Sequence, residues 1–231
     1  MSASTPQASA SFNDPAAIAS YADKARRLVP GRDDLQTMAA LLVAERAPED
    51  AHVLVIGAGG GVELAAFAQR YPAWRFTGVD PSQPMLDLAR TALGPLAARA
   101  ELHHGYVDTA PAGPFDAATC LLTMHFLSTD ERRRTLQHIH RRLKPGAPFV
   151  MAHLSFPQAP GERALWLARN AAFAMASGVD PADARRAQSA IGSTLPLISP
   201  DDEEVLLREA GFTGVALFYA GLAFRGWVGH A

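Results

Sequence analysis

Residues 53–61 read VLVIGAGGG, an apolar run that stops in a glycine-rich loop. A continuous apolar run of this kind is typical of a strand that is covered on both faces of a parallel sheet. The glycines let the chain turn sharply and leave no side chain where a flat ligand must approach. A second short strand ends at Asp80, where a carboxylate can accept hydrogen bonds from two ribose hydroxyls. Together these features predict an α/β crevice that binds an adenosine group.

The spacing of the glycines separates two classes of nucleotide site. A dinucleotide fingerprint would need glycine where Val62 stands, whereas the third glycine here is Gly61. The chain resembles the class I S-adenosylmethionine (SAM) dependent methyltransferases at this point. The resemblance continues through FTGVDPSQPMLDLAR at 76–90, FDAATCLL at 115–122 and LKPGAPFV at 143–150. It implies SAM as the cofactor and methyl transfer to a small-molecule acceptor.

Alternating strand and helix patterns predict a Rossmann-like sheet of seven strands, mostly parallel, with a helical insertion before the sixth strand. The final two strands are predicted to form an antiparallel hairpin that turns at Ala220–Gly221. The resemblance implies that this hairpin adds a reversed strand at the edge of the sheet. The predicted strands span about 52–56, 74–79, 99–104, 116–122, 147–154, 212–219 and 222–228. The predicted helices span about 15–27, 33–46, 61–70, 84–92, 130–143, 161–177, 181–191 and 201–210, the last capped by Ser199 or Asp201.

Length and composition predict one domain. Residues 1–13 are expected to be a disordered tail, and 14–231 a single SAM-binding domain in which the insertion 157–210 acts as a lid or as an interface for a homodimer. The formal net charge of −2 gives no general attraction to nucleic acid. The single cysteine excludes an intramolecular disulfide, and neither a signal peptide nor an apolar stretch of about 18 residues is visible. We therefore expect a cytoplasmic protein without a membrane span.

The expected cofactor contacts begin with the glycine loop. Gly57, Gly59 and Gly61 are expected to pass under the methionine and ribose parts of SAM, with Asp80 on the ribose and Met85 against the adenine. The alternatives are a plain strand–helix turn, a helix cap and a core methionine, respectively. The other residues expected around the cofactor are Ala58, Pro81, Val107 and Leu121, with Tyr21, Arg27 and Arg32 from the helices before the first strand.

The chain departs from the family pattern at two places. The family usually has an acidic residue two positions before the first glycine, and Val55 stands there. The family also has Gly-Asp after the third strand, whereas this chain reads Gly-Tyr-Val-Asp from Gly105. Tyr106 could stack on the adenine, and Asp108 could accept from its amino group.

Two histidines are candidates for acid–base chemistry. His125 follows the fourth strand and His153 ends the fifth, and ligands of open α/β sheets bind outside the carboxyl ends of the strands. A neutral imidazole there could take a proton from a hydroxyl or an amine of the acceptor. The alternative is that both are polar residues that merely finish their strands. No metal site is expected, because no cluster of Cys and His has zinc spacing.

The terminal regions resemble one family more closely, the carboxy-SAM synthases, which convert SAM and prephenate into carboxy-SAM. The resemblance is carried by RLVPG at 27–31, LLREAGF at 206–212 and the hairpin that follows. That family has Tyr where Arg32 stands, and a basic pair in its insertion to which Arg185 and Arg186 could correspond. Three hypotheses follow: a small-molecule methyltransferase, a carboxy-SAM synthase-like enzyme, and a SAM-binding regulator without catalysis.

Overall fold

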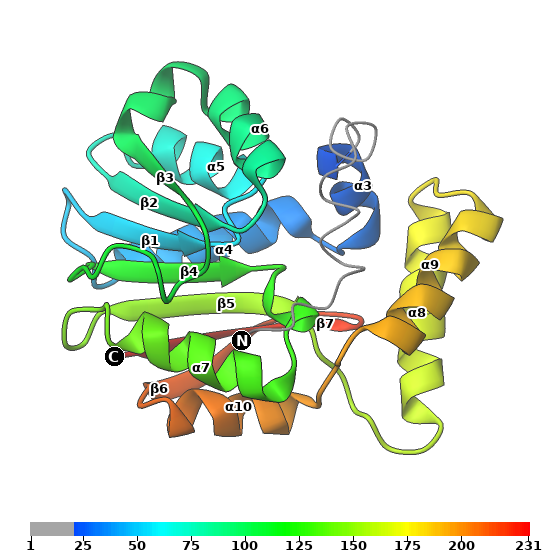
Figure 1. The fold of residues 1–231 in the computed structure, drawn as a ribbon. Coiled ribbons are helices and arrows are strands. Elements are labelled where there is room, and N and C mark those ends of the chain that lie inside the picture. The colour runs from blue at the N-terminus through cyan, green and yellow to red at the C-terminus, as the bar shows by residue number, and fades with distance from the viewer. Residues whose placement is uncertain (1–20) are drawn as a thin grey trace.

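A computed structural model describes residues 21–231 of the chain, in which seven strands form one sheet in the order β3-β2-β1-β4-β5-β7-β6 (Figure 1). The predicted tail 1–13 and the predicted helix start near 15 lie outside the described residues. The strands are β1 (His52–Ile56), β2 (Arg75–Asp80), β3 (Ala100–His104), β4 (Ala117–Leu121), β5 (Pro148–Leu154), β6 (Thr213–Gly221) and β7 (Phe224–His230). The predicted mixed sheet is therefore confirmed.

The first five strands are parallel, and β7 runs antiparallel to both of its neighbours, β5 and β6. The predicted hairpin is present, but the prediction of a reversed edge strand was wrong in position, because β7 lies inside the sheet and β6 forms the edge. The predicted turn at Ala220–Gly221 was also early. Gly221 still pairs with Phe224, so the turn falls at Leu222, where φ is 52°. Glycine at 221 instead leaves room for the hydroxyl of Tyr219.

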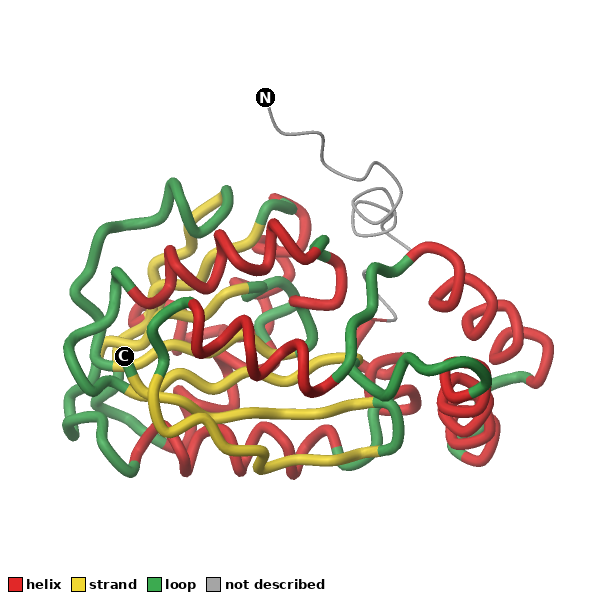
Figure 2. The backbone as a smooth tube through the Cα atoms, turned by 90° about the horizontal axis from the view of Figure 1, so that it is seen from below, coloured by secondary structure: helices red, strands yellow, loops and turns green. Residues whose placement is uncertain are grey.

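Helices cover both faces of the sheet, as Figure 2 shows from below. Along β1, Val53 and Val55 join a core with helices α4 and α5, whereas Leu54 and Ile56 join a second core with α7 and α10. This alternation explains why the whole strand is apolar. The helices are α3 (Tyr21–Leu28), α4 (Arg32–Ala44), α5 (Val62–Arg70), α6 (Gln83–Leu93), α7 (Thr129–His140), α8 (Glu162–Ala176), α9 (Pro181–Thr194) and α10 (Pro200–Glu209), with short 3-10 turns η1 (Gly94–Arg99) and η2 (Met124–Phe126).

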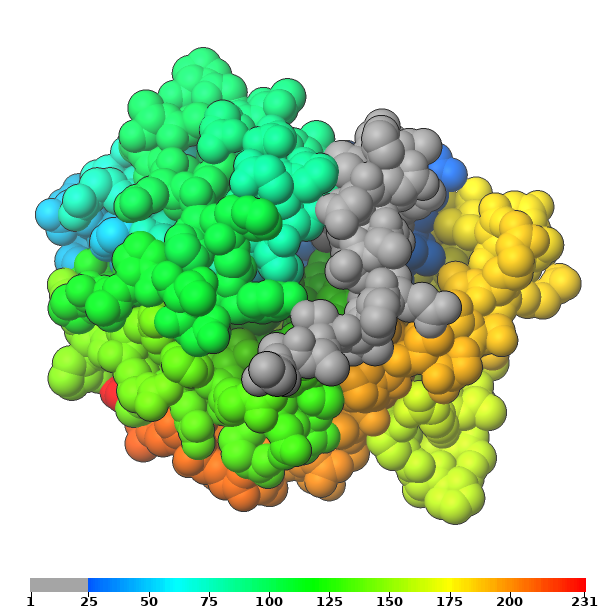
Figure 3. Space-filling view, viewed as in Figure 1, coloured from blue at the N-terminus to red at the C-terminus, as the bar shows by residue number. Residues whose placement is uncertain are grey.

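The insertion before β6 divides into two parts. Helices α8 and α9 pack on each other beside α3 and project from the end of the molecule to which the parallel strands point (Figures 1 and 3). Helix α10 instead returns to the sheet and lies next to α7. Its capping residue is Ser199, whose hydroxyl accepts from the Asp202 N–H at 3.2 Å. Within residues 21–231, no helix combines the length and the apolar character that a membrane crossing requires.

Candidate functional site

The glycine loop between β1 and α5 is packed tightly by protein atoms. Gly57 and Gly61 have φ values of 75° and 68°, which favour glycine. A Cβ atom at Gly57 would overlap the side chain of Thr123, and one at Gly61 would come within 2.6 Å of the Ala89 backbone. The loop is therefore wedged between the end of β4 and α6. Any contact from these two glycines to a cofactor would have to come from their backbone.

Asp80 is held in place at the end of β2 by backbone donors. Its Oδ2 accepts from the Gly59 N–H at 2.9 Å, and its Oδ1 accepts from the Ser82 N–H at 2.8 Å. Burial raises the pKa of this carboxyl, and the hydrogen bonds from Ser82 and Gly59 oppose that rise. Because the carboxylate is only partly solvated, further hydrogen-bond donors would stabilise its charge. The buried Met85 lies beneath Gly59, where it limits that position to glycine. The carboxylate is thus oriented before any ligand arrives.

The loops beside Asp80 contain the remaining residues predicted for the adenine. The carbonyl of Pro81 lies 3.0 Å from Nε2 of His104. After β3, the side chain of Tyr106 is 51% exposed, Val107 is buried and Asp108 is exposed. An exposed aromatic ring at this edge is accessible to a flat ligand.

A cavity of about 30 Å³ adjoins the glycine loop, on the side that faces α4 and the end of β4. Two charged side chains line it although they are largely buried, Arg32 from α4 and Glu63 from α5. Glu63 accepts a hydrogen bond from the hydroxyl of Thr119 on β4. The full lining consists of Arg32, Gln36, Gly57, Gly59, Val62, Glu63, Leu121 and Leu122.

Glu63 is the charged residue of the cavity lining that was not predicted from the sequence. Burial raises its pKa to about 7, and the hydrogen bond from Thr119 and the charge of Arg32 oppose that rise. The sequence did hold a signal for it, because Glu63 stands four residues before Phe67 and so lies on the buried face of its helix. A carboxylate on such a face is a feature that needs a functional explanation.

His125 lies in η2, directly after β4, and is 7% exposed. Its Nδ1 atom is buried and has no hydrogen-bond partner among residues 21–231. Burial, together with His153 and the charge of Arg132, holds the pKa of this imidazole well below 6.5. The ring is therefore neutral at pH 7, which is the form that a general base needs before it acts.

His153 is in a different environment. Its side chain is fully buried, and its Nε2 atom lies 2.7 Å from Oε1 of Glu203 on α10. The same carboxylate oxygen binds the guanidinium of Arg132 on α7. The ring centres of His125 and His153 are 6.4 Å apart. His153 thus belongs to a buried network behind His125, a connection that local sequence patterns did not contain.

The predicted residues of the front helices are separated from one another. Arg27 is exposed and donates to the carbonyl of Gly178 at 3.2 Å, which ties α3 to the end of α8. The side chain of Tyr21 lies outside the described part of the chain. Arg186 is 73% exposed and pairs with Asp183 on its own helix. Of the three arginines considered for an acidic substrate, Arg32 lines the cavity, whereas Arg185 and Arg186 are exposed on α9.

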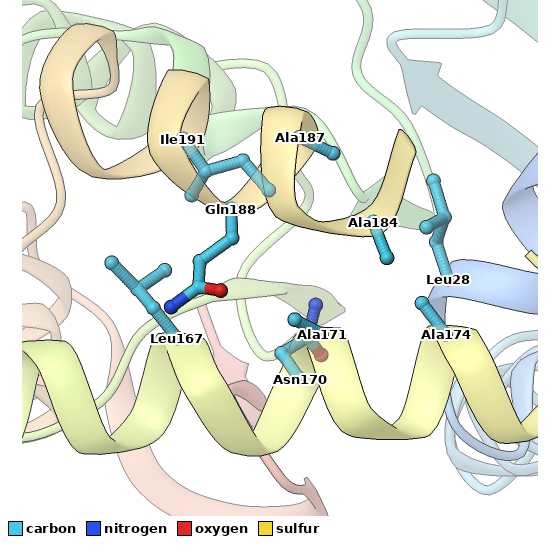
Figure 4. A pocket seen from close by; sticks show the side chains of 9 residues that line it. All are labelled: Leu28, Leu167, Asn170, Ala171, Ala174, Ala184, Ala187, Gln188 and Ile191. Carbon is cyan, nitrogen blue, oxygen red and sulfur yellow. The ribbon is translucent and has the colours of Figure 1, made fainter. Parts of the chain in front are cut away.

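A second hollow of about 10 Å³ lies between α8 and α9, and Figure 4 shows Asn170 and Gln188 there among leucine, isoleucine and alanine side chains. It contains no charged residue and none of the predicted site residues. The described residues contain no group of three or more Cys, His, Asp or Glu side chains that could hold a metal ion. The predicted residues that meet at the carboxyl edge of the sheet are Arg32, Gly57, Ala58, Gly59, Gly61, Asp80, Pro81, Met85 and Leu121.

Comparison with known proteins agrees with this geometry. The methyltransferase domain family matches residues 53–146, from β1 to the turn before β5. A carboxy-S-adenosyl-L-methionine synthase of Chromohalobacter salexigens is 30% identical over 222 residues, which cover 93% of this chain and 81% of that protein. The chain belongs to the class I SAM-dependent methyltransferases. The cofactor of this methyltransferase is SAM.

Two further similarities place the methyltransferase among longer proteins. An O-methyltransferase of Penicillium expansum, cnsE, is 30% identical over 166 residues, which cover 70% of this chain and 51% of that protein. The solved structure of an O-methyltransferase family protein from Burkholderia thailandensis superposes with a TM-score of 0.70 at 18% identity, covering 97% of this chain and 62% of that one. The chain therefore spans about half to three fifths of these two proteins.

Proposed function

We propose that this methyltransferase transfers the methyl group of SAM to a hydroxyl or an amine of a small-molecule acceptor. The observation that carries the proposal is Asp80, whose two oxygens are fixed by the N–H groups of Gly59 and Ser82 beside a cavity lined by the same glycine. The ribose hydroxyls would donate to this carboxylate. The methionine part of SAM would then extend past the glycine loop into the cavity, and the sulfonium would lie between them.

Methyl transfer from a sulfonium requires little of the protein beyond positioning. The nucleophile must approach in line with the breaking bond, at about 3 Å from the methyl carbon. A neutral base near the acceptor oxygen or nitrogen then removes its proton. His125 suits this role best among the two candidate histidines, because it follows β4 at the carboxyl edge and keeps 7% exposure, whereas His153 is fully buried with its Nε2 2.7 Å from Oε1 of Glu203.

His153 suits a supporting role. Its Nε2 is engaged by Glu203, and its side chain is fully buried in the network with Arg132. This network lies behind η2, because Arg132 also donates to the carbonyl of Leu127 at 3.0 Å. We therefore assign His125 as the first choice of base and His153 as part of the structure that holds it.

Carboxy-SAM synthesis is the second candidate, because the relative from Chromohalobacter salexigens bears that name over most of the chain. Such chemistry needs a cation near the sulfonium to bind the added carboxylate. Arg32 lines the cavity and could supply this positive charge, whereas Arg186 is exposed on α9. The family's Tyr is absent at position 32, which favours methyl transfer as the first proposal.

One experiment separates the two reactions. The purified protein is incubated with SAM labelled in its methyl group, either with the low-mass fraction of a cell extract or with prephenate, and the products are analysed by mass spectrometry. Methyl transfer predicts labelled methyl on an acceptor and formation of S-adenosylhomocysteine. A cofactor that gains the mass of one carboxyl group in the prephenate sample would overturn the methyltransferase proposal.

Assembly is a separate part of the proposal. We expect a homodimer formed through the insertion 157–210, because α8 and α9 project from the end of the sheet (Figure 1) and Leu165 of α8 is 46% exposed. Light scattering of the purified chain tests this expectation, and a monomer at all concentrations would contradict it.

A further inference from the structure

Two largely buried charges of opposite sign line the cavity next to the glycine loop. Arg32 is 5% exposed and Glu63 is 9% exposed, and they reach the cavity from two different helices, α4 and α5. Charged side chains are rarely buried unless they serve a partner, because removing a charge from water is costly. Arg32 and Glu63 attract each other, and because both also line the cavity, they suit a ligand that carries both signs of charge close together.

The strand that usually supplies an acidic group cannot do so here. Val55 stands two residues before Gly57, and it is fully buried in the sheet core. Glu63 is the acidic side chain in the lining of the cavity. It comes from the first turn of α5, two residues beyond Gly61, and the hydroxyl of Thr119 on β4 donates to one of its oxygens.

The position of Gly59 connects this cavity to the ribose site. Gly59 lines the cavity, and its N–H donates to the Asp80 carboxylate at 2.9 Å. A ligand whose ribose is bound at Asp80 can therefore extend an arm across this one residue into the cavity. In SAM, that arm ends in an α-ammonium and an α-carboxylate.

We infer that Glu63 and Arg32 form the subsite for the amino-acid end of SAM, with the Glu63 carboxylate on the α-ammonium and the Arg32 guanidinium on the α-carboxylate. The inference rests on the proposed function, because it requires SAM to occupy the crevice at Asp80. In this chain the ammonium would therefore be bound from α5, by Glu63, and not from β1, where Val55 replaces the acidic residue that the family usually has. The Glu63 carboxyl, whose pKa burial raises to about 7, gains a matched cation when the ligand enters.

Three ligands test the two contacts separately by calorimetry at pH 8. S-adenosylhomocysteine carries both charged groups, its decarboxylated form carries only the ammonium, and 5′-methylthioadenosine carries neither; all three are thioethers without a sulfonium charge. Glu63→Gln keeps the shape and the acceptor that Thr119 uses. It should weaken the first two ligands by about 10- to 100-fold and change methylthioadenosine by less than about twofold.

Arg32→Met provides the complementary variant. It should weaken S-adenosylhomocysteine by about 10-fold or more and leave the other two ligands within about twofold. Asp80→Ala serves as the matched control, since it should weaken all three ligands by a similar factor. Because methylthioadenosine is measured with each variant, a general loss of folding would show as a loss of all three affinities.

The possible failures can be told apart. If Asp80→Ala weakens every ligand while Glu63→Gln alters none, the crevice binds SAM and the subsite is wrong. If Glu63→Gln weakens all three equally, its effect is structural and the subsite is likewise wrong. If the wild-type chain binds none of the three, the proposed function fails, and the inference fails with it.

Discussion

Nε2 of His153 lies 2.7 Å from Oε1 of Glu203, and both side chains are buried in the interior of the protein. The same oxygen binds Arg132, whose guanidinium also donates to the carbonyls of Leu127 and Pro196 at 3.0 and 2.7 Å. One carboxylate thus joins β5, α7 and α10 to the chain that follows β4. The network fixes the segment that carries His125.

Removing this carboxylate should destabilise the protein strongly. Glu203→Ala leaves the buried charge of Arg132 without its counter-ion, which typically costs about 3–5 kcal/mol. Urea unfolding measures the loss, and Glu204→Ala is the control, because Glu204 forms a surface pair with Arg208 that should contribute less than about 1 kcal/mol. Equal effects of the two substitutions would contradict a structural role for the network.

Substitution of the two histidines should affect different quantities, kcat for His125 and the free energy of unfolding for His153. His125→Ala should lower kcat by about 10²- to 10⁴-fold with little change in SAM affinity, as expected when a general base is lost. His153→Ala should mainly lower the free energy of unfolding. Kinetics with an identified acceptor, combined with urea unfolding, compare the two variants. Unchanged turnover in His125→Ala would remove the general-base role and leave the methyltransferase assignment standing.

The pH profile gives an independent test of His125. Since burial holds the pKa of its imidazole well below 6.5, the base stays deprotonated into the acidic range. The acid limb of kcat/KM should therefore lie below pH 6.5. A limb at or above that pH would mean that another group, or a differently placed His125, controls the reaction.

Glu63 should lower the stability of the protein while no ligand is bound. Its folded-state pKa of about 7 lies above the unfolded value of 4.5, so the native state binds more protons between these values and loses stability as pH rises through them. Glu63→Gln should thus stabilise the unliganded protein by up to about 3 kcal/mol at pH 8, and by less at pH 5.

Urea unfolding at the two pH values measures this difference. Arg32 on α4 and Cys120 on β4 are the charged or titratable groups that act on Glu63 among the described residues. Cys120 remains a neutral thiol because burial and the Glu63 charge raise its pKa. A stabilisation that is equal at pH 5 and pH 8 would show that Glu63 does not carry the cost of a buried charge.

The parallel part of the sheet could be predicted because its signals are local. The run 148–154 is buried along its whole length and begins at Pro148, and the apolar run of β1 ends at Gly57. The position of β7 could not be read in the same way. A hairpin pattern fixes the pairing of its own two strands but not which of them joins the rest of the sheet, and here β7 pairs with β5.

The parts of the candidate site that could be predicted are those for which the residue type and its place next to a strand indicate the role. Asp80 at a strand end and the glycines of the loop are such residues. Glu63 and Glu203 were missed because their roles depend on partners far along the chain, Thr119 and Arg132. Their acidic side chains look like ordinary surface residues of helices until the packing is known.

The central claim is that SAM binds at the carboxyl edge of the sheet with its ribose on Asp80. Calorimetry with SAM tests it most directly, using the wild-type chain, Asp80→Ala and the control Asp87→Ala, which removes an exposed carboxylate of α6 that pairs with Arg90. The account predicts binding of one SAM per chain, a loss of about 10- to 100-fold in affinity for Asp80→Ala, and no more than about a twofold change for Asp87→Ala. Unchanged affinity in Asp80→Ala would contradict the account, because the ribose would then be held elsewhere.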